Sequence, residues 1–169
     1  MGAPLTQTQL PLESILDLNG KQTYLGNAFI LPQNGKQLTD TSEHPIMYIS
    51  NPAGSGKSLF MYQRKYGTDN NNAILRFYFN PTINALNSAT VPVNLRTSAT
   101  QTSVSNCYLS STITSNGTLF KSISITVYTI DANLLFIIDP GTSYLITAQQ
   151  VSGSSGNSDI YIENTWYEI

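Results

Sequence analysis

The residues best suited to chemistry lie in one stretch, 45–66, where two apolar runs flank a cluster of glycine, serine and proline. Residues 56–58, Gly-Lys-Ser, end like a phosphate-binding P-loop, whose full pattern is G-x-x-x-x-G-K-S/T. The first glycine of that pattern is replaced by Asn51, and Pro52 has no backbone N–H to donate to a phosphate. A nucleotide hydrolase built on this loop would also need a helix that begins at about Ser58, because a helix N-terminus completes a phosphate site.

The residues after this loop are instead typical of a β-strand. Residues 59–66 are rich in aromatic side chains and alternate, with Phe60, Tyr62, Arg64 and Tyr66 on one side of the predicted strand. We interpret the stretch as a strand, a tight turn and a second strand, in which asparagine, proline and glycine set the backbone geometry. No catalytic constellation stands elsewhere in the sequence, so we expect no enzyme, no catalytic residue and no cofactor.

Three isolated residues have structural explanations that are simpler than chemical ones. His44 is the only histidine and has no fixed partner in the sequence, which indicates a surface residue. Asp69 precedes a run of asparagines, but the alternating acidic pattern and closing glutamate of a calcium loop are missing, so we expect a solvated turn and no metal. Cys107 is the only cysteine, which excludes an internal disulfide, and we expect it to be a small buried side chain.

The composition describes a polar surface with little charge. The chain has 169 residues, enough for one domain with a sizeable core, yet charged residues make up only 11% and the net charge is −2. Serine, threonine, asparagine and glutamine supply the polarity, as is common in extracellular or particle-borne β proteins. No basic stripe is present to hold phosphates, so we expect no nucleic-acid partner. A loose myristoylation pattern at the N-terminus lacks a second anchoring signal, and we expect no membrane partner.

From residue 23 onward the sequence predicts about ten short strands separated by turn signals. The Asn116-Gly117 turn predicts a hairpin between its two flanking strands, and Pro92 favours an edge position for its strand. This rhythm indicates an all-β fold, an antiparallel, jelly-roll-like β-sandwich, although a barrel of another topology stays open. The predicted strands are 23–31, 45–50, 57–66, 73–79, 90–95, 107–114, 118–130, 133–139, 143–151 and 159–169.

The N-terminal residues lack this alternation. We predict that residues 1–22 form an extended arm, with a single helical turn as the alternative, and that residues 23–169 form the sandwich domain. An arm of this kind buries little by itself and becomes ordered by docking on a partner. Its short apolar patch predicts the partner-binding residues, which are Leu12, Ile15, Leu16 and Leu18.

Several turn and strand segments, taken in order, resemble those of a known group of proteins. These segments are Asn51-Pro52-Ala53-Gly54-Ser55-Gly56-Lys57, Phe79-Asn80-Pro81-Thr82, Thr90-Val91-Pro92-Val93-Asn94-Leu95, Pro140-Gly141-Thr142-Ser143-Tyr144-Leu145 and Trp166-Tyr167-Glu168. Over residues 50–169 the chain is similar to tailed-bacteriophage virion structural proteins of the small β-sandwich head-decoration, auxiliary capsid or head-fibre type. The resemblance implies a non-enzymatic structural role in the virion and a homo-oligomer, commonly a trimer. It also implies an N-terminal segment that attaches to the major capsid protein or another virion protein.

A second hypothesis comes from the abundance of tyrosine and from Trp166. Sugars stack on exposed aromatic rings, so the chain could instead be a glycan-binding or receptor-binding adhesin module of a phage tail or fibre. This hypothesis predicts that aromatic side chains gather on one patch facing solvent. The sequon at Asn116 is chemically a glycosylation acceptor, but a turn explains it without a secretory route.

Overall fold

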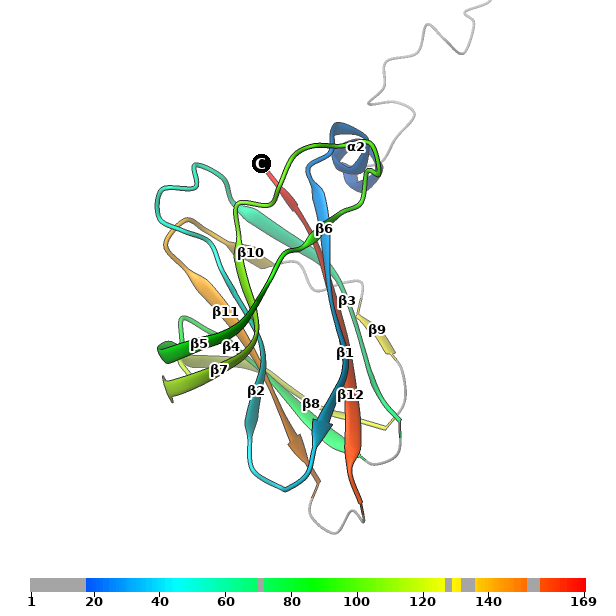
Figure 1. Ribbon diagram of the computed structural model, residues 1–169, viewed down its shortest axis with the longest axis vertical. Helices are drawn as coiled ribbons and strands as arrows, with labels where there is room; N and C mark the ends of the chain where they lie inside the picture. The colour runs from blue at the N-terminus through cyan, green and yellow to red at the C-terminus, as the bar shows by residue number, and fades with distance from the viewer. Residues whose placement is uncertain (1–17, 70–71, 127–128, 132–135, 152–155) are drawn as a thin grey trace, which may run out of the picture.

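The computed structural model describes residues 18–69, 72–126, 129–131, 136–151 and 156–169. In these residues the strands form two six-stranded antiparallel sheets that pack face to face, and one short helix, α2 (Leu18–Leu25), lies at the same end of the sandwich as the C-terminus (Figure 1). The predicted all-β antiparallel sandwich is therefore confirmed.

The first sheet, sheet A, has the order β10-β3-β12-β1-β6, with β9 also paired to β3. Its strands are β1 (Ala28–Leu38), β3 (Leu59–Thr68), β6 (Val93–Asn94), β9 (Thr129–Asp131), β10 (Phe136–Ile138) and β12 (Ser158–Glu168). The second sheet, sheet B, has the order β5-β7-β2-β11-β4-β8. Its strands are β2 (His44–Ser50), β4 (Ala73–Phe79), β5 (Thr82–Thr90), β7 (Asn106–Ser115), β8 (Thr118–Ile125) and β11 (Ser143–Gln150).

The strand pairs are nested, and this nesting confirms the jelly-roll prediction. The first strand pairs with the last, β1 with β12, and successive pairs inward are β2 with β11, β3 with β10, and β4 with β8. These pairs fall alternately in sheet A and sheet B. An antiparallel ribbon wound in this way gives the two four-stranded sheets of a jelly roll.

The innermost strand pair of the roll, β4 with β8, bends sharply and continues outward as the β5–β7 ribbon. Phe79 pairs with Thr118 at the end of β4 and β8, and after two-residue connections Thr82 pairs with Ser115 at the start of the β5–β7 ribbon. Each connection contains a residue with a positive φ, which is Asn80 in the first and Gly117 in the second. A Cβ on Gly117 would lie 2.3 Å from the carbonyl oxygen of Phe79. The predicted hairpin at Asn116-Gly117 is wrong, because β7 pairs with β5 and β2 whereas β8 pairs with β4.

Residues 80–117 form an insertion that covers one side of the sandwich. Within this insertion β7 pairs with β2 at the side of sheet B, and β6 pairs with β1 at the side of sheet A. The edge position predicted from Pro92 is confirmed for β6, which ends the order of sheet A. Figure 1 shows β5 and β7 side by side, running across the direction of β2 and away from the two stacked sheets.

The start of the sandwich differs from the prediction of a strand over 23–31. Residues 18–25 form the helix α2 (Leu18–Leu25), and β1 begins later and runs through Pro32 to Leu38. In the described residues β6 pairs only with Phe29 and Ile30, so Pro32 interrupts no ladder on that side. The register shifts between Gln33 and Lys36, so Asn34 and Gly35 form a bulge within the strand.

The core between the sheets is mainly aliphatic, with a cluster of aromatic rings and the buried guanidinium of Arg64. Rings from β4, β8, β10 and β11 meet there, and Phe79 stacks on Phe120 at 4.2 Å between centroids. The guanidinium of Arg64, 2% exposed, lies 3.6 Å from the ring centroid of Phe77 and donates to the hydroxyl of Tyr144. The strict alternation predicted for β3 is wrong, because a register shift opposite Thr165 places both Met61 and Arg64 toward the core.

Candidate functional site

The residues that imitate a P-loop have structural roles. They lead directly into β3, as the strand interpretation predicted, and Ser58 donates its hydroxyl proton to Asp139 at 2.9 Å. Asn51, 1% exposed, donates from Nδ2 to the carbonyls of Lys57 at 2.7 Å and Ile138 at 2.9 Å. The loop is thereby fixed to β10, and its lysine turns toward the carboxylate of Glu168, with Nζ 4.0 Å from Oε2.

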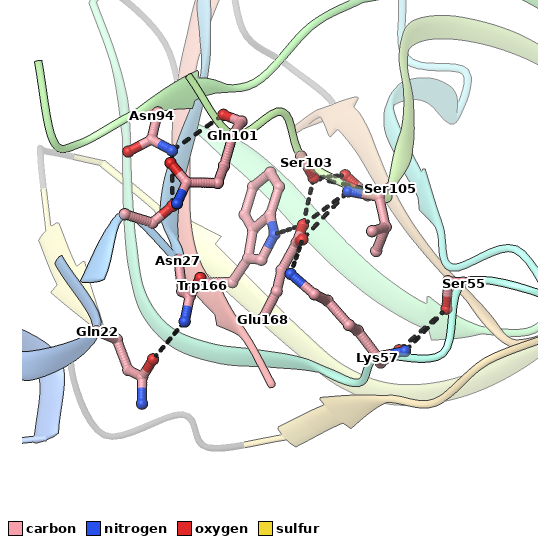
Figure 2. Close-up of polar contacts among 12 residues, drawn as sticks. Gln22, Asn27, Ser55, Lys57, Asn94, Gln101, Ser103, Ser105, Trp166 and Glu168 are labelled. Atoms are coloured by element: carbon pink, nitrogen blue, oxygen red, sulfur yellow. Dashed lines mark hydrogen bonds and ion pairs between the residues drawn. The ribbon is translucent and has the colours of Figure 1, made fainter. Parts of the chain in front are cut away.

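That carboxylate is the centre of a buried polar cluster, which Figure 2 shows. Glu168 is fully buried, near the end of β12. Its oxygens accept hydrogen bonds from the hydroxyl of Ser103, from the backbone N–H of Val104 at 3.1 and 3.2 Å, and from the indole N–H of Trp166 at 3.2 Å. Because Ser103 and Val104 belong to the insertion, the carboxylate joins the insertion to the last strand of the sandwich.

The side chains beside Glu168 form a chain of hydrogen bonds in which each donor points toward the carboxylate. Ser103 gives its proton to the carboxylate, so its oxygen accepts from the hydroxyl of Ser105 at 2.6 Å and from the N–H of Ser105 at 3.1 Å. The sulfur of Cys107 lies 3.3 Å from the Ser105 oxygen. Burial raises the pKa of the Cys107 thiol to about 12, so the thiol keeps its proton at neutral pH and donates it to Ser105. The prediction that Cys107 is buried is confirmed.

The raised pKa of Cys107 predicts a loss of stability at alkaline pH. The unfolded thiol ionises near its ordinary pKa of 9.0, whereas the folded thiol keeps its proton up to about 12. Between these values the folded state binds more protons, so stability that is fully present below pH 9 falls as pH rises, by up to about 1.4 kcal/mol per pH unit. We expect the difference in unfolding free energy between the wild type and Cys107→Ala, measured by urea denaturation, to shrink between about pH 8 and about pH 10.5. If the free energies of unfolding of the two proteins changed with pH in parallel, the result would contradict the conclusion that burial raises the pKa of Cys107.

A surface pocket of about 300 Å³ opens beside the same hydroxyl chain, where the end of β5 meets the segment 102–108. Its lining carries no charged side chain. The half-buried ring of Tyr108 forms part of the wall and lies 6.2 Å from the ring of Tyr48, centroid to centroid. The pocket therefore combines neutral polar groups with an aromatic face.

A second polar cluster lies where the bent ribbon meets β4, around the carboxylate of Glu43. It accepts hydrogen bonds from Thr147 at 2.5 Å, Tyr78 at 2.8 Å, Arg76 at 3.2 Å and Asn116 at 3.2 Å. Burial, together with the bond to Glu43, raises the pKa of Tyr78. Every described donor comes from another strand or turn, so Glu43 fastens the bend at Asn116 to sheet B.

The residues predicted to bind a partner are only partly visible. Leu12, Ile15 and Leu16 lie outside the described residues, and Leu18 is the first residue of α2, 53% exposed.

His44 is partly exposed, with its Nε2 2.8 Å from the Asp40 carboxylate, and this hydrogen bond lowers the pKa of Asp40. No group of three or more histidine, cysteine, aspartate or glutamate side chains in the described part of the chain is arranged to hold a metal.

In the part of the chain that the structure describes, the aromatic side chains do not form the exposed patch that the glycan hypothesis predicted. Trp166 is fully buried, so its ring is not free to stack on a sugar, and this part of the hypothesis is wrong. The most exposed tyrosines among the described residues are Tyr24 on α2 and Tyr161 on β12, which lie on different elements. Tyr108 of the pocket is a different candidate, which the sequence did not distinguish from the other strand tyrosines.

The class that the fold defines is a jelly-roll β-sandwich with a ribbon insertion between its fourth and fifth roll strands. Comparison of the chain with protein-family models, with curated proteins and with solved structures finds no match. Over the residues that the structure describes, no helix is long and apolar enough to cross a membrane.

Proposed function

We propose that this chain is a non-enzymatic structural subunit of a virion. In this role it forms a homo-oligomer, with three copies as the expected number, and acts as a capsid decoration or head-fibre subunit that is attached through its N-terminal arm. The observation that carries the assembly role is the β5–β7 ribbon. No residue of β5 is buried, and Leu86 is 44% exposed.

The ribbon is poorly explained as part of an isolated subunit. A two-stranded ribbon gains little stability without a layer packed on one of its faces, and β5 presents Ile83, Ala85, Leu86 and Ala89 without any charged residue. The register shifts near Ile83, and Ser88 has a positive φ of 55°, which interrupts the free edge against simple strand addition. We infer that the ribbon packs through its side chains against another copy of the chain.

Two further observations support this proposal. The jelly roll is an architecture found in viral capsid proteins and in lectins, which is support by analogy of fold. The side chains that could serve as nucleophile or general base also make structural contacts. Lys57 and Ser58 face carboxylates, and Cys107 is buried.

Light scattering on the purified protein tests the assembly role. We expect an oligomer at tens of micromolar, and we expect Leu86→Asp to convert it to a folded monomer because a charge would be buried in the interface. Leu119→Asp is the matched control, since Leu119 is 50% exposed on β8, which ends the order of sheet B opposite β5, and this variant should keep the wild-type mass. A wild-type monomer at that concentration would overturn the self-assembly proposed here.

A further inference from the structure

Beyond the assembly role, the structure assigns a binding site for a neutral saccharide to the pocket between the end of β5 and the segment 102–108. The pocket has a volume of about 300 Å³, which is at the lower end of the range for small-molecule sites. Its walls come from four parts of the insertion: the end of β5, the connection to β6, the connection from β6 to β7, and the start of β7. The argument rests on which of its polar groups are free, on its lack of charge and on its apolar wall.

The polar groups of the pocket divide into a saturated floor and a free rim. Ser103 donates to Glu168 and accepts two hydrogen bonds from Ser105, so it has no capacity left for a ligand. Within the described residues, the hydroxyls and amide of the rim make no hydrogen bond to the protein. These rim side chains are Thr90, Thr102, Asn106 and Tyr108. Each rim group can both donate and accept, which matches the hydroxyls of a sugar.

The charges near the pocket favour a neutral ligand. The lining itself has no charged side chain, and the nearest carboxylate, Glu168, is fully buried behind Ser103. Lys57 balances its negative charge, so the site has no net positive charge to hold an anion such as a phosphate or a sialic acid. The ammonium of Lys57, 4.0 Å from that carboxylate, already supplies a positive charge, so the site also offers little to a cationic ligand.

The rest of the pocket wall is apolar and can pack against the C–H groups on one face of a sugar ring. Tyr108 presents an aromatic ring, and the connection after β5 adds Val91, which is 73% exposed, and the buried Pro92. Val91 is the most exposed of the large apolar side chains in the described residues. A pyranose ring packed between these groups would remove apolar surface from water while its hydroxyls reach the rim.

Titration of the ¹⁵N-labelled protein, followed by amide chemical shifts, tests this site. The probes are glucose, galactose, mannose and N-acetylglucosamine, with glucose 6-phosphate and N-acetylneuraminic acid as anionic counterparts. We expect saturable shifts for at least one neutral sugar, confined to residues 89–92 and 102–108, with a Kd on the order of 1 mM. We expect both anionic sugars to bind at least about tenfold more weakly.

Two substitutions separate a binding role from a structural one. Asn106→Ala, at an exposed side chain, should weaken binding about tenfold without changing the thermal midpoint, and Tyr108→Ala should abolish saturable shifts. Tyr161→Ala is the control, because this tyrosine lies on sheet A and should leave binding unchanged. The site would be overturned by the absence of saturable shifts with every neutral sugar, by shifts elsewhere, by equal binding of the anionic sugars, or by normal binding in Asn106→Ala.

Discussion

Replacing Glu168 by alanine should lower the free energy of unfolding by about 3–5 kcal/mol, one of the two largest effects we expect. The carboxylate is fully buried and accepts hydrogen bonds from Ser103, Val104 and Trp166. Its removal leaves these donors buried without a partner, and it also releases the segment 103–104 from β12. Thermal unfolding should show a midpoint lower by about 6–20 °C.

The matched control for this loss is Glu163→Ala. Glu163 is paired with Lys65 at 2.7 Å, but both side chains are partly exposed, so removing this ion pair should cost less than about 1 kcal/mol. Equal losses in the two variants would show that the buried hydrogen bonds of Glu168 contribute no more than a surface pair, which contradicts the structural role given to it here.

The proposed attachment through the N-terminal arm predicts that a chain shortened to begin at Leu18 folds normally but fails to bind the capsid or other virion protein. The deleted residues include Leu12, Ile15 and Leu16, whose burial with Leu18 against a partner would contribute on the order of 6–10 kcal/mol before the cost of ordering the arm. That cost is comparable or larger, because about ten residues of backbone would be fixed. The arm should become ordered only on a partner that also supplies backbone hydrogen bonds, and it should add little to the stability of the isolated chain. We therefore expect a thermal midpoint within about 2 °C of the full chain and loss of co-sedimentation with particles that lack this protein.

A longer deletion, of residues 1–25, is the control for the boundary of the domain. It removes α2, in which Gln22 is buried and accepts a hydrogen bond from Asn27 at 3.1 Å, while the carbonyl of Tyr24 accepts one from Arg96 at 2.6 Å. The thermal midpoint should fall clearly for this deletion and not for the shorter one. If the chain that begins at Leu18 attaches normally, the contact with the particle lies on the sandwich and the arm has no role in attachment.

Strands with one buried face were predictable from the sequence, and strands without one were not. β4 occupies the predicted 73–79 because Ala73, Leu75 and Phe77 are fully buried and alternate with less buried residues. β5 has no buried face, so its residues Thr82–Thr90 show no alternation to detect. The helix α2 contains glycine and threonine, which favour helices weakly, and its contacts with distant segments such as Arg96 hold it in place.

The polar cluster at Glu168 was beyond sequence reasoning for a similar reason. Its hydrogen-bond partner Ser103 lies 65 residues earlier in the chain, and Lys57 is more distant still. The Asn116-Gly117 signal was local and correctly marked a turn, yet it carried no information on which strands would pair beyond it. Pairing was decided by the nested winding of the whole chain, which a two-residue pattern does not encode.

The nesting of the roll also limits when this protein can fold. β12, residues 158–168, lies between β3 and β1 in sheet A and pairs with both along most of its length. Until β12 has been synthesised and has left the ribosome, β1 and β3 have no common neighbour, and their apolar inner faces stay exposed to water and to other chains. Ala28 must then find Tyr167 across almost the whole sequence, a search that is slow in β proteins of high contact order. Newly made chains should therefore depend on chaperones, or on low synthesis temperature, far more than the finished sandwich does.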